Sequence, residues 1–337
     1  MLTPDDVAGP THDLKWGEIV GFAATNQVLP EFKSHEVGAI AANFNNNIQR
    51  IKSMLVAPTL IGDLTMDIQH CIDFAEFSST KSVSDPILRI PMSPEILKLA
   101  NQIFHMNNKE MFEAQEQGGD KWQEFYLASL NRGTQPVVML QGTASGVGLE
   151  AMLSSAWTGT WTAFETMAGD LWETALNLHP VVLAELRGRK KRSTKTETDK
   201  GEHPESLKHV HLSEILRYQF DLRNKMGSVH RNQRRFDSLT GIREAYRTAF
   251  SKNAVEIDRV IDYNGLDALN AVRNLIVHRA GIVDREYKKR ASYLKIPDAK
   301  LGESILLDGQ LTMDMMISVI KVSFHLIETV DKWISEN

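Results

Sequence analysis

The sequence has few of the residues that cross-link a chain or anchor it in a membrane. Cys71 is the single cysteine among 337 residues, which excludes an internal disulfide and a cysteine-based zinc finger and is typical of a reducing compartment. No uncharged apolar run approaches the roughly 18 residues of a membrane-spanning helix. The opening MLTPDD has neither the basic nor the apolar region of a secretory signal. We therefore expect a cytoplasmic protein without a membrane anchor.

The sequence also lacks a strong excess of either charge. Its net charge is −5, with 24% charged and 42% hydrophobic residues, an ordinary globular composition that excludes wholesale disorder and fibrous repeats. The charge is nevertheless uneven, because residues 1–148 carry 10 basic and 17 acidic residues whereas residues 149–337 carry 28 and 26. A chain of this length predicts about two domains. We expect a mostly helical N-terminal region of unknown fold over 1–148 and a second, helical domain over 149–337.

The spacing of hydrophobic residues predicts a mainly α protein. Leu149–Leu178 carries the longest stripe, with apolar residues every three or four positions and two tryptophans one turn apart, which is typical of a helix facing a core. Ser93 is an expected N-cap before Pro94. The other expected helices are 45–56, 93–106, 121–130, 212–225, 239–250, 265–278 and 312–334. The second domain should therefore be a bundle of four to five helices.

Two segments of the first region are predicted not to be helical. Residues 131–133 (NRG) should close the helix over 121–130, and Pro136–Leu140 reads either as one short buried strand or as an extended connection. The glycine-rich 141–148 (QGTASGVG) lacks the ending of a phosphate-binding loop, so we interpret it as a loop between the two regions.

Clusters of possible metal ligands are weak in this sequence. Asp67, His70, Asp73 and Glu76 have helical spacing, but nothing brings three or four of them to one point, so a solvated helix face is the better interpretation. A second group, His203, His209, His211 and His230, follows a charged stretch and is interpreted as solvated. We expect neither a metal nor another cofactor.

Basic residues gather in two places of the second region. The stretch 187–201 has no apolar residue and reads as a solvated loop, while RNQRR at 231–235 forms a second basic patch. Either patch can neutralise phosphates, but taken alone the first is better explained as a solvated linker. The candidate RNA-binding residues are Arg187, Arg189, Lys190, Lys191, Arg192, Arg231, Arg234 and Arg235.

The strongest pattern lies in the expected helix over 265–278. Asn274 and His278 are four residues apart and share one helix face, and Arg273 reaches the same side through its long side chain. Ala280 and Gly281 follow as a helix stop. A plain structural interpretation is also open, in which Arg273 and His278 only stabilise the helix end.

The segment RNLIVHRAG at 273–281, on a late helix of an all-α domain whose first helix is long and aromatic, resembles the HEPN superfamily. The resemblance is greatest to its RNase LS-like and RiboL-PSP groups and covers roughly residues 149–337. Arg273, Asn274 and His278 match the family motif of arginine, a polar residue and a later histidine. Ala280 replaces the tyrosine of members that pair with nucleotidyltransferase antitoxins, which argues against that branch.

The resemblance implies a metal-independent endoribonuclease whose site forms where two copies meet. Arg273 would hold the phosphate, His278 would transfer protons and Asn274 would orient the histidine, with a 2′,3′-cyclic phosphate as product. RNA would be the substrate, and a transfer RNA is one candidate. A toxin or antiviral setting, with an antitoxin or defence-system partner, is implied in the same way. Glu165 lies off the main stripe and is a further residue that could approach the site.

A second function is compatible with the same resemblance. Many HEPN domains are non-catalytic and bind RNA, or serve as dimerisation and regulatory modules. The first region would then be a sensor or effector. A third interpretation is a helical interaction protein in which Arg273 and His278 only tie helices together.

Overall fold

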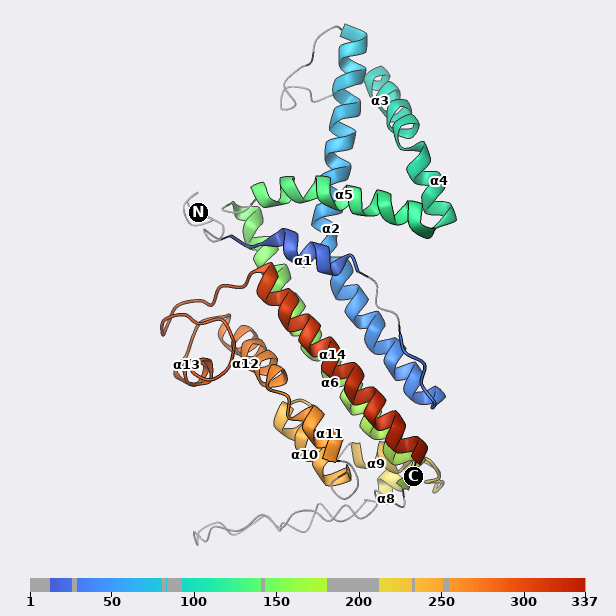
Figure 1. The fold of residues 1–337 in the computed structure, drawn as a ribbon, viewed down its shortest axis with the longest axis vertical. Coiled ribbons are helices and arrows are strands. Elements are labelled where there is room, and N and C mark those ends of the chain that lie inside the picture. Colours follow the sequence, from blue (N-terminus) through green and yellow to red (C-terminus); the bar gives the residue numbers. More distant parts are fainter. Residues whose placement is uncertain are drawn as a thin grey trace. The chain divides into compact units, whose positions relative to one another are not determined.

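The described part of the chain folds into α-helices joined by turns (Figure 1). In this computed structural model it has no β-strand, and Ile282 and Ser304 form one isolated antiparallel bridge. The residues that the structure describes are 13–25, 29–80, 83, 93–140, 143–180, 212–231, 234–250 and 255–336. The prediction of a mainly α protein is confirmed.

The helices form two compact units that are discontinuous in sequence. Unit 1 takes its described residues from Met1–Asn26, Arg50–Ala156 and Leu307–Met313. Unit 2 takes its described residues from Gln27–Gln49, Trp157–Leu306 and Asp314–Asn337. Three long helices, α2 (His35–Thr80), α6 (Ala144–Leu178) and α14 (Gly309–Glu336), therefore contribute residues to both units. This division differs from a single boundary near residue 148.

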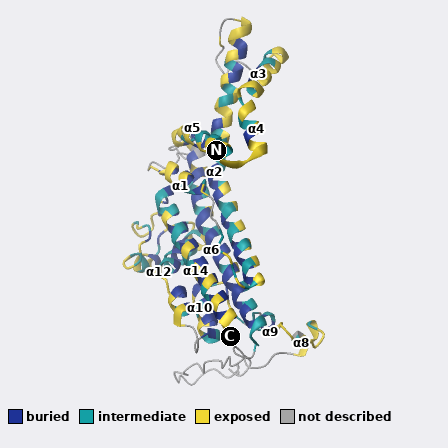
Figure 2. Ribbon diagram, turned by 45° about the vertical axis from the view of Figure 1, so that its right-hand side comes forward, coloured by how far each residue is buried: buried dark blue, intermediate teal, exposed yellow. Residues whose placement is uncertain are grey.

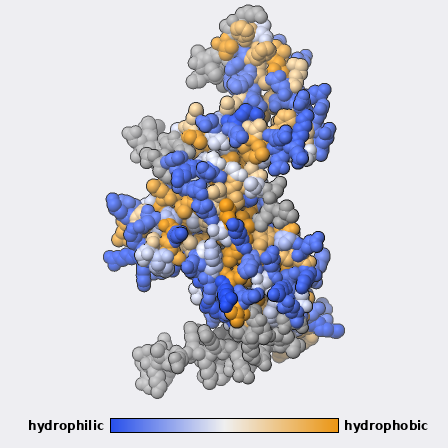
Figure 3. Space-filling model, viewed as in Figure 1, coloured by the Kyte–Doolittle hydropathy of each residue, from blue (hydrophilic) through white to orange (hydrophobic). Residues whose placement is uncertain are grey.

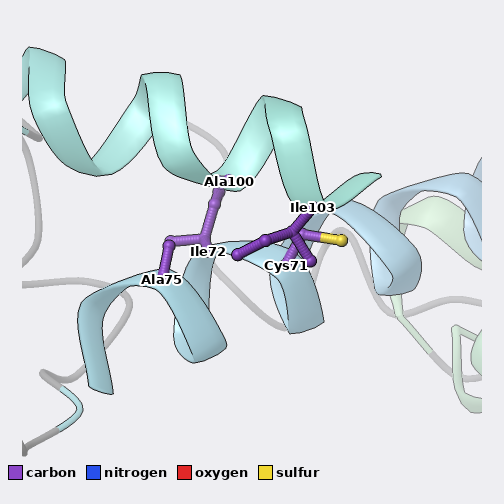
Figure 4. Packing of buried hydrophobic residues seen from close by; sticks show 5 residues of the cluster. All are labelled: Cys71, Ile72, Ala75, Ala100 and Ile103. Atoms are coloured by element: carbon purple, nitrogen blue, oxygen red, sulfur yellow. The ribbon is translucent and has the colours of Figure 1, made fainter. Parts of the chain in front are cut away.

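In unit 1, a small apolar cluster joins the second half of α2 to α3 (Pro94–Asn107). Figure 4 shows its members, which are Cys71, Ile72, Ala75, Ala100 and Ile103. The hydroxyl of Ser93 accepts a hydrogen bond from the amide of Ile96 (3.3 Å), which confirms the expected N-cap. Several large apolar side chains of these two helices stay exposed, and Figure 3 shows hydrophobic surface over them.

The remaining helices of unit 1 are α1 (Trp16–Ala23), α4 (Lys109–Gln117) and α5 (Gly119–Met139). The expected break at 131–133 and the strand or extended stretch at Pro136–Leu140 are wrong, because α5 continues through both to Met139. A contact with α2 outweighs these local signals. A Cβ at Gly133 would lie 1.9 Å from the Thr59 carbonyl oxygen, and Arg132 pairs with Asp63 (2.8 Å) beside it.

Unit 2 is built around the second part of α6. Trp157, Trp161 and Phe164 are fully buried, as the predicted stripe requires, and Figure 2 shows buried residues along α6 and α14. The indole N–H of Trp172 donates to the Ala245 carbonyl (3.1 Å) on α10 (Leu239–Phe250). The glycine-rich stretch before α6 is only partly a loop, because α6 already begins at Ala144, while residues 141–142 lie outside the described residues.

Short helices complete unit 2. They are α8 (Leu212–Arg217), α9 (Met226–Arg231), α10 (Leu239–Phe250), α11 (Val255–Ile261), α12 (Asn264–Arg279) and α13 (Arg285–Ala291). The single helix expected over 212–225 is wrong. The chain leaves helical geometry after α8, since Gln219, Phe220 and Asn224 have positive φ angles of 52°, 62° and 54°. The expected helices over 239–250, 265–278 and 312–334 are confirmed within one to three residues at each end.

The start of α2 belongs to unit 2 through its contacts with α14. Phe44 packs edge-on against Phe324, with ring centroids 5.5 Å apart. The carboxylate of Asp331 accepts hydrogen bonds from the backbone amides of Lys33 (2.8 Å) and Ser34 (2.9 Å), which precede α2. None of the helices searched among the described residues has the length and apolarity needed to cross a membrane.

Candidate functional site

The motif helix α12 is fixed by its buried face and by its end. Leu266, Leu269, Val272 and Leu275 are buried, which leaves the polar positions between them on the outer side of the helix. Ala280 adopts a left-handed conformation (φ 51°) and the amide of Gly281 bonds to the Leu275 carbonyl (3.1 Å). These bonds satisfy carbonyls at the helix end, so the predicted stop at 280–281 is confirmed.

The side chains of Arg273 and Asn274 contact each other. The Arg273 guanidinium donates to Asn274 Oδ1 (2.8 Å), and Asn274 Nδ2 donates to Asn270 Oδ1 (3.2 Å). The guanidinium also lies over the Trp161 ring, 5.8 Å from its centroid. Among the described residues, no carboxylate forms an ion pair with Arg273. Its positive charge is therefore held by a ring and an amide, which do not neutralise it.

Glu165 on α6 contacts the same indole at its N–H. Its carboxylate accepts a hydrogen bond from Trp161 Nε1 (2.7 Å). Burial raises the pKa of Glu165, while the Trp161 hydrogen bond and the charge of Arg273 act in the opposite direction. The pattern of α6 placed Glu165 off the main stripe, and its carboxylate bonds to Trp161, the ring over which Arg273 lies.

The imidazole of His278 is exposed at the last turn of α12 and lines a pocket of about 230 Å³ together with Asn274. The opposite wall comes from α13 and the turn before it, where Asp284 caps α13 and pairs with Arg279 (3.4 Å). Tyr287 anchors that wall, because its hydroxyl donates to the Pro297 carbonyl (2.7 Å). The pocket is thus small and open to solvent, and its lining mixes apolar and charged groups.

Within one chain the three motif residues are linked but not convergent. Asn274 contacts Arg273 and lines the pocket with His278, whereas Arg273 itself is not among the residues that line it. One copy of the site therefore presents a cation, an amide and an imidazole in sequence along one edge of α12. This arrangement can bind an anion and transfer a proton.

The predicted RNA-binding residues fall into three groups. Arg187, Arg189, Lys190, Lys191 and Arg192 lie outside the described residues, as do His203, His209 and His211. Arg231 pairs with Asp170 (2.8 Å) and Glu173 (3.3 Å), so it holds α9 against α6. Arg235 pairs with Asp237 (3.4 Å), while Arg234 is partly exposed. Neither Arg234 nor Arg235 lines the His278 pocket.

The other weak candidates stay without a function. A search of the described residues finds no group of three or more metal-binding side chains. Asp73 instead accepts a hydrogen bond from Gln69 on the same helix (2.8 Å). A second pocket, which is polar and has a volume of about 270 Å³, lies beside α13. It could not be predicted from the sequence, because its lining comes from three separate helices.

Comparisons with known proteins assign neither a family nor a function to this chain. No family model, no curated protein and no solved structure matches the chain.

Proposed function

We propose that this protein is a homodimeric, metal-independent endoribonuclease that uses Arg273, Asn274 and His278. The observation that carries the proposal is the Arg273 guanidinium, which is bonded to Asn274, forms no ion pair with a described carboxylate and lies five residues before the exposed His278. A cation held in place by an amide and a ring, without a direct ion pair, is suited to an external anion such as a phosphodiester. The HEPN resemblance of the same three residues points to the same chemistry.

The proposed reaction needs one acid and one base. An imidazole titrates near neutral pH and can serve as either. One His278 would take the proton from a ribose 2′-hydroxyl as its oxygen attacks the adjacent phosphorus. The bond from phosphorus to the 5′-oxygen breaks, and a second histidine gives that oxygen a proton. The products are a 2′,3′-cyclic phosphate and a 5′-hydroxyl, and Arg273 would stabilise the charge on the phosphoryl oxygens.

A second copy of the chain would supply the second histidine. Apolar side chains stay exposed in the segment that carries His278, with exposed fractions of 51% for Val277, 44% for Ile282 and 55% for Leu306. Such a patch beside the site is suited to burial between two copies. A toxin or antiviral setting, with an antitoxin or defence-system partner, remains a proposal that rests on the HEPN resemblance alone.

The test uses the purified full-length protein, total RNA and excess EDTA. We expect cleavage that leaves 2′,3′-cyclic phosphate ends, and we expect His278→Ala to abolish it. His325→Ala is the matched control, because His325 is an exposed histidine of unit 2 on α14, outside the pocket. Equal cleavage by His278→Ala and wild type would overturn the catalytic assignment.

The non-catalytic alternative is favoured by one observation, that Arg273 does not line the pocket of His278 within a single copy. In that case the protein would bind RNA or act as a dimerisation module. Wild-type protein that shifts RNA in a gel and leaves it intact would select this function. A monomer in solution that neither binds nor cuts RNA would leave only the structural role of Arg273 and His278.

A further inference from the structure

We propose that the second pocket beside α13 binds one nucleotide of a single-stranded RNA, with the base stacked on Tyr293 and a phosphate on Lys289. Its position next to a cleavage site rests on the proposed function, whereas the binding of RNA does not. The pocket lies between α10, α12 and α13, and its polar lining is Thr240, Arg243, Asp267, Asn270, Glu286, Lys289, Arg290 and Tyr293.

The charges of this pocket leave one free cation. Arg243 forms a bidentate pair with Asp267 (2.8 and 2.7 Å). Arg290 pairs with Glu286 one turn earlier on α13 (2.9 Å). Lys289 is exposed and has no ion-pair partner among the residues that the structure describes. The pocket therefore carries a net positive charge that is suited to a single phosphate.

Tyr293 adds a flat apolar surface beside that cation. Its side chain is 69% exposed and has no ring contact or hydrogen bond with the described part of the chain. The backbone nevertheless holds it in place, since its amide bonds to the Arg290 carbonyl (3.2 Å) and continues the turn of α13. An exposed aromatic ring next to a lysine is the arrangement that binds unpaired bases, because a base stacks on the ring while the phosphate meets the charge.

This pocket shares part of its wall with the pocket of His278. Glu286 and Arg290 line both. Asn270 of the second pocket is hydrogen-bonded to Asn274 of the first (3.2 Å). A strand that places one phosphate near His278 would therefore place a neighbouring nucleotide against Tyr293.

The lining favours a nucleotide over an apolar ligand. Ionic side chains dominate the lining, which disfavours an apolar ligand. Duplex RNA hides its base faces inside the helix, so only a single strand can use the exposed ring.

The test measures binding of a fluorescent 2′-O-methyl oligoadenylate of 12 nucleotides, which cannot be cleaved through its 2′-oxygen. We expect Tyr293→Ala to weaken binding about 5- to 100-fold, the effect of losing one stacked base. Tyr293→Phe keeps the ring and should bind within about twofold of wild type. An oligonucleotide of the same length without bases should bind wild type and Tyr293→Ala equally.

Salt dependence tests the lysine. Lys289→Gln should weaken binding and lower the slope of log affinity against log salt by about 0.7, which corresponds to one phosphate contact on a single strand. Lys321→Gln is the matched control, because Lys321 is exposed on α14 and lies outside both pockets. Melting curves confirm that each variant is folded.

Two outcomes overturn the inference. One is unchanged RNA affinity in Tyr293→Ala. The other is polyglutamate binding that is tighter than RNA binding and depends on Lys289, which would assign this surface to an acidic protein. The two proposals fail separately. Cleavage that needs His278 but not Tyr293 sinks only the nucleotide site, whereas Tyr293-dependent binding without cleavage sinks only the ribonuclease.

Discussion

Two arginines contact α6 in unit 2, and their surroundings differ. Arg231 meets two carboxylates, Asp170 and Glu173, and lies 5.5 Å from the centroid of the Phe236 ring. Arg273 meets the Trp161 ring and the amide of Asn274, without a described carboxylate in an ion pair. The first arginine has direct ion pairs inside the fold, whereas the second has none and acts on the Glu165 carboxylate only through its charge.

This difference separates a residue that holds helices together from one that is available to a ligand. A charge that is already paired gains little from a phosphate, because the new contact would cost the old ones. An ordered but unpaired guanidinium can offer its donors to an external anion without that loss. Basic residues in a sequence therefore predict nucleic-acid contacts only after their acidic neighbours are known.

The largest expected effect comes from removing Arg273, the arginine on α12 that has no ion pair. Arg273→Ala should lower RNA cleavage about 100-fold or more, the cost of removing one preorganised donor to a developing charge. The unfolding free energy should fall by only about 1–2 kcal/mol, since the lost contacts are the cation–π pair with Trp161 and one hydrogen bond to Asn274. Cleavage assays and urea unfolding of the same preparation measure both. Arg273→Lys, which keeps the charge, should give intermediate cleavage; a large loss of stability in Arg273→Ala would contradict this prediction.

The next largest effect comes from removing Arg231, the ion-paired arginine on α9. Arg231→Ala leaves Asp170 and Glu173 without their partner, and the unfolding free energy should fall by about 1–2 kcal/mol, a value moderated by solvent around the half-exposed Asp170. Thermal unfolding checks this, with a loss of roughly 1–3 °C in Tm for a chain of this length. Arg235→Ala is the control, because its pair with Asp237 is solvent-exposed. A folded Arg231→Ala with strongly reduced cleavage would show that Arg231 belongs to the site after all.

The smallest expected effect is on the pH dependence of stability and comes from Glu165, the carboxylate bonded to Trp161. Burial raises the pKa of this carboxyl, so the folded state keeps the proton to higher pH than the unfolded state. Its contribution to stability is therefore complete below the ordinary pKa and declines as the pH rises through the raised value. Glu165→Gln retains an acceptor for Trp161 and should lose this decline. Urea unfolding between acidic and neutral pH would compare Glu165→Gln with wild type. Glu328→Gln, at an exposed site, is the control. Identical pH profiles for Glu165→Gln and wild type would rule the effect out.

The sequence predicted the parts of the fold that depend on local periodicity. The stripe through Trp157, Trp161 and Phe164 identified α6, and the helix stop at 280–281 was correct because it depends on adjacent residues. The end expected at residues 131–133 was wrong because Gly133 is needed for a close approach to Thr59, a neighbour that is 74 positions away in the chain. Local breaking signals cannot be distinguished from tight packing without that neighbour.

The same reason limits what could be predicted about the site. Asn274 and His278 are neighbours on one helix, so their shared edge followed from spacing. The carboxylates that neutralise Arg231 lie on α6, far away along the chain, and could not be inferred from RNQRR. The pocket of Lys289 and Tyr293 depends in the same way on residues from α10 and α12.

Because α2 and α14 contribute to both units, the chain cannot be divided into two fragments at a single residue. A fragment that starts at residue 149 would omit Phe44, the ring that packs against Phe324, and the two amides that bond to Asp331. Its hydrophobic interior would be left open to water along α14. The part of the chain from residue 149 onward, which carries His278, should therefore not fold properly without the start of α2. Recombination between proteins would have to exchange these two segments together.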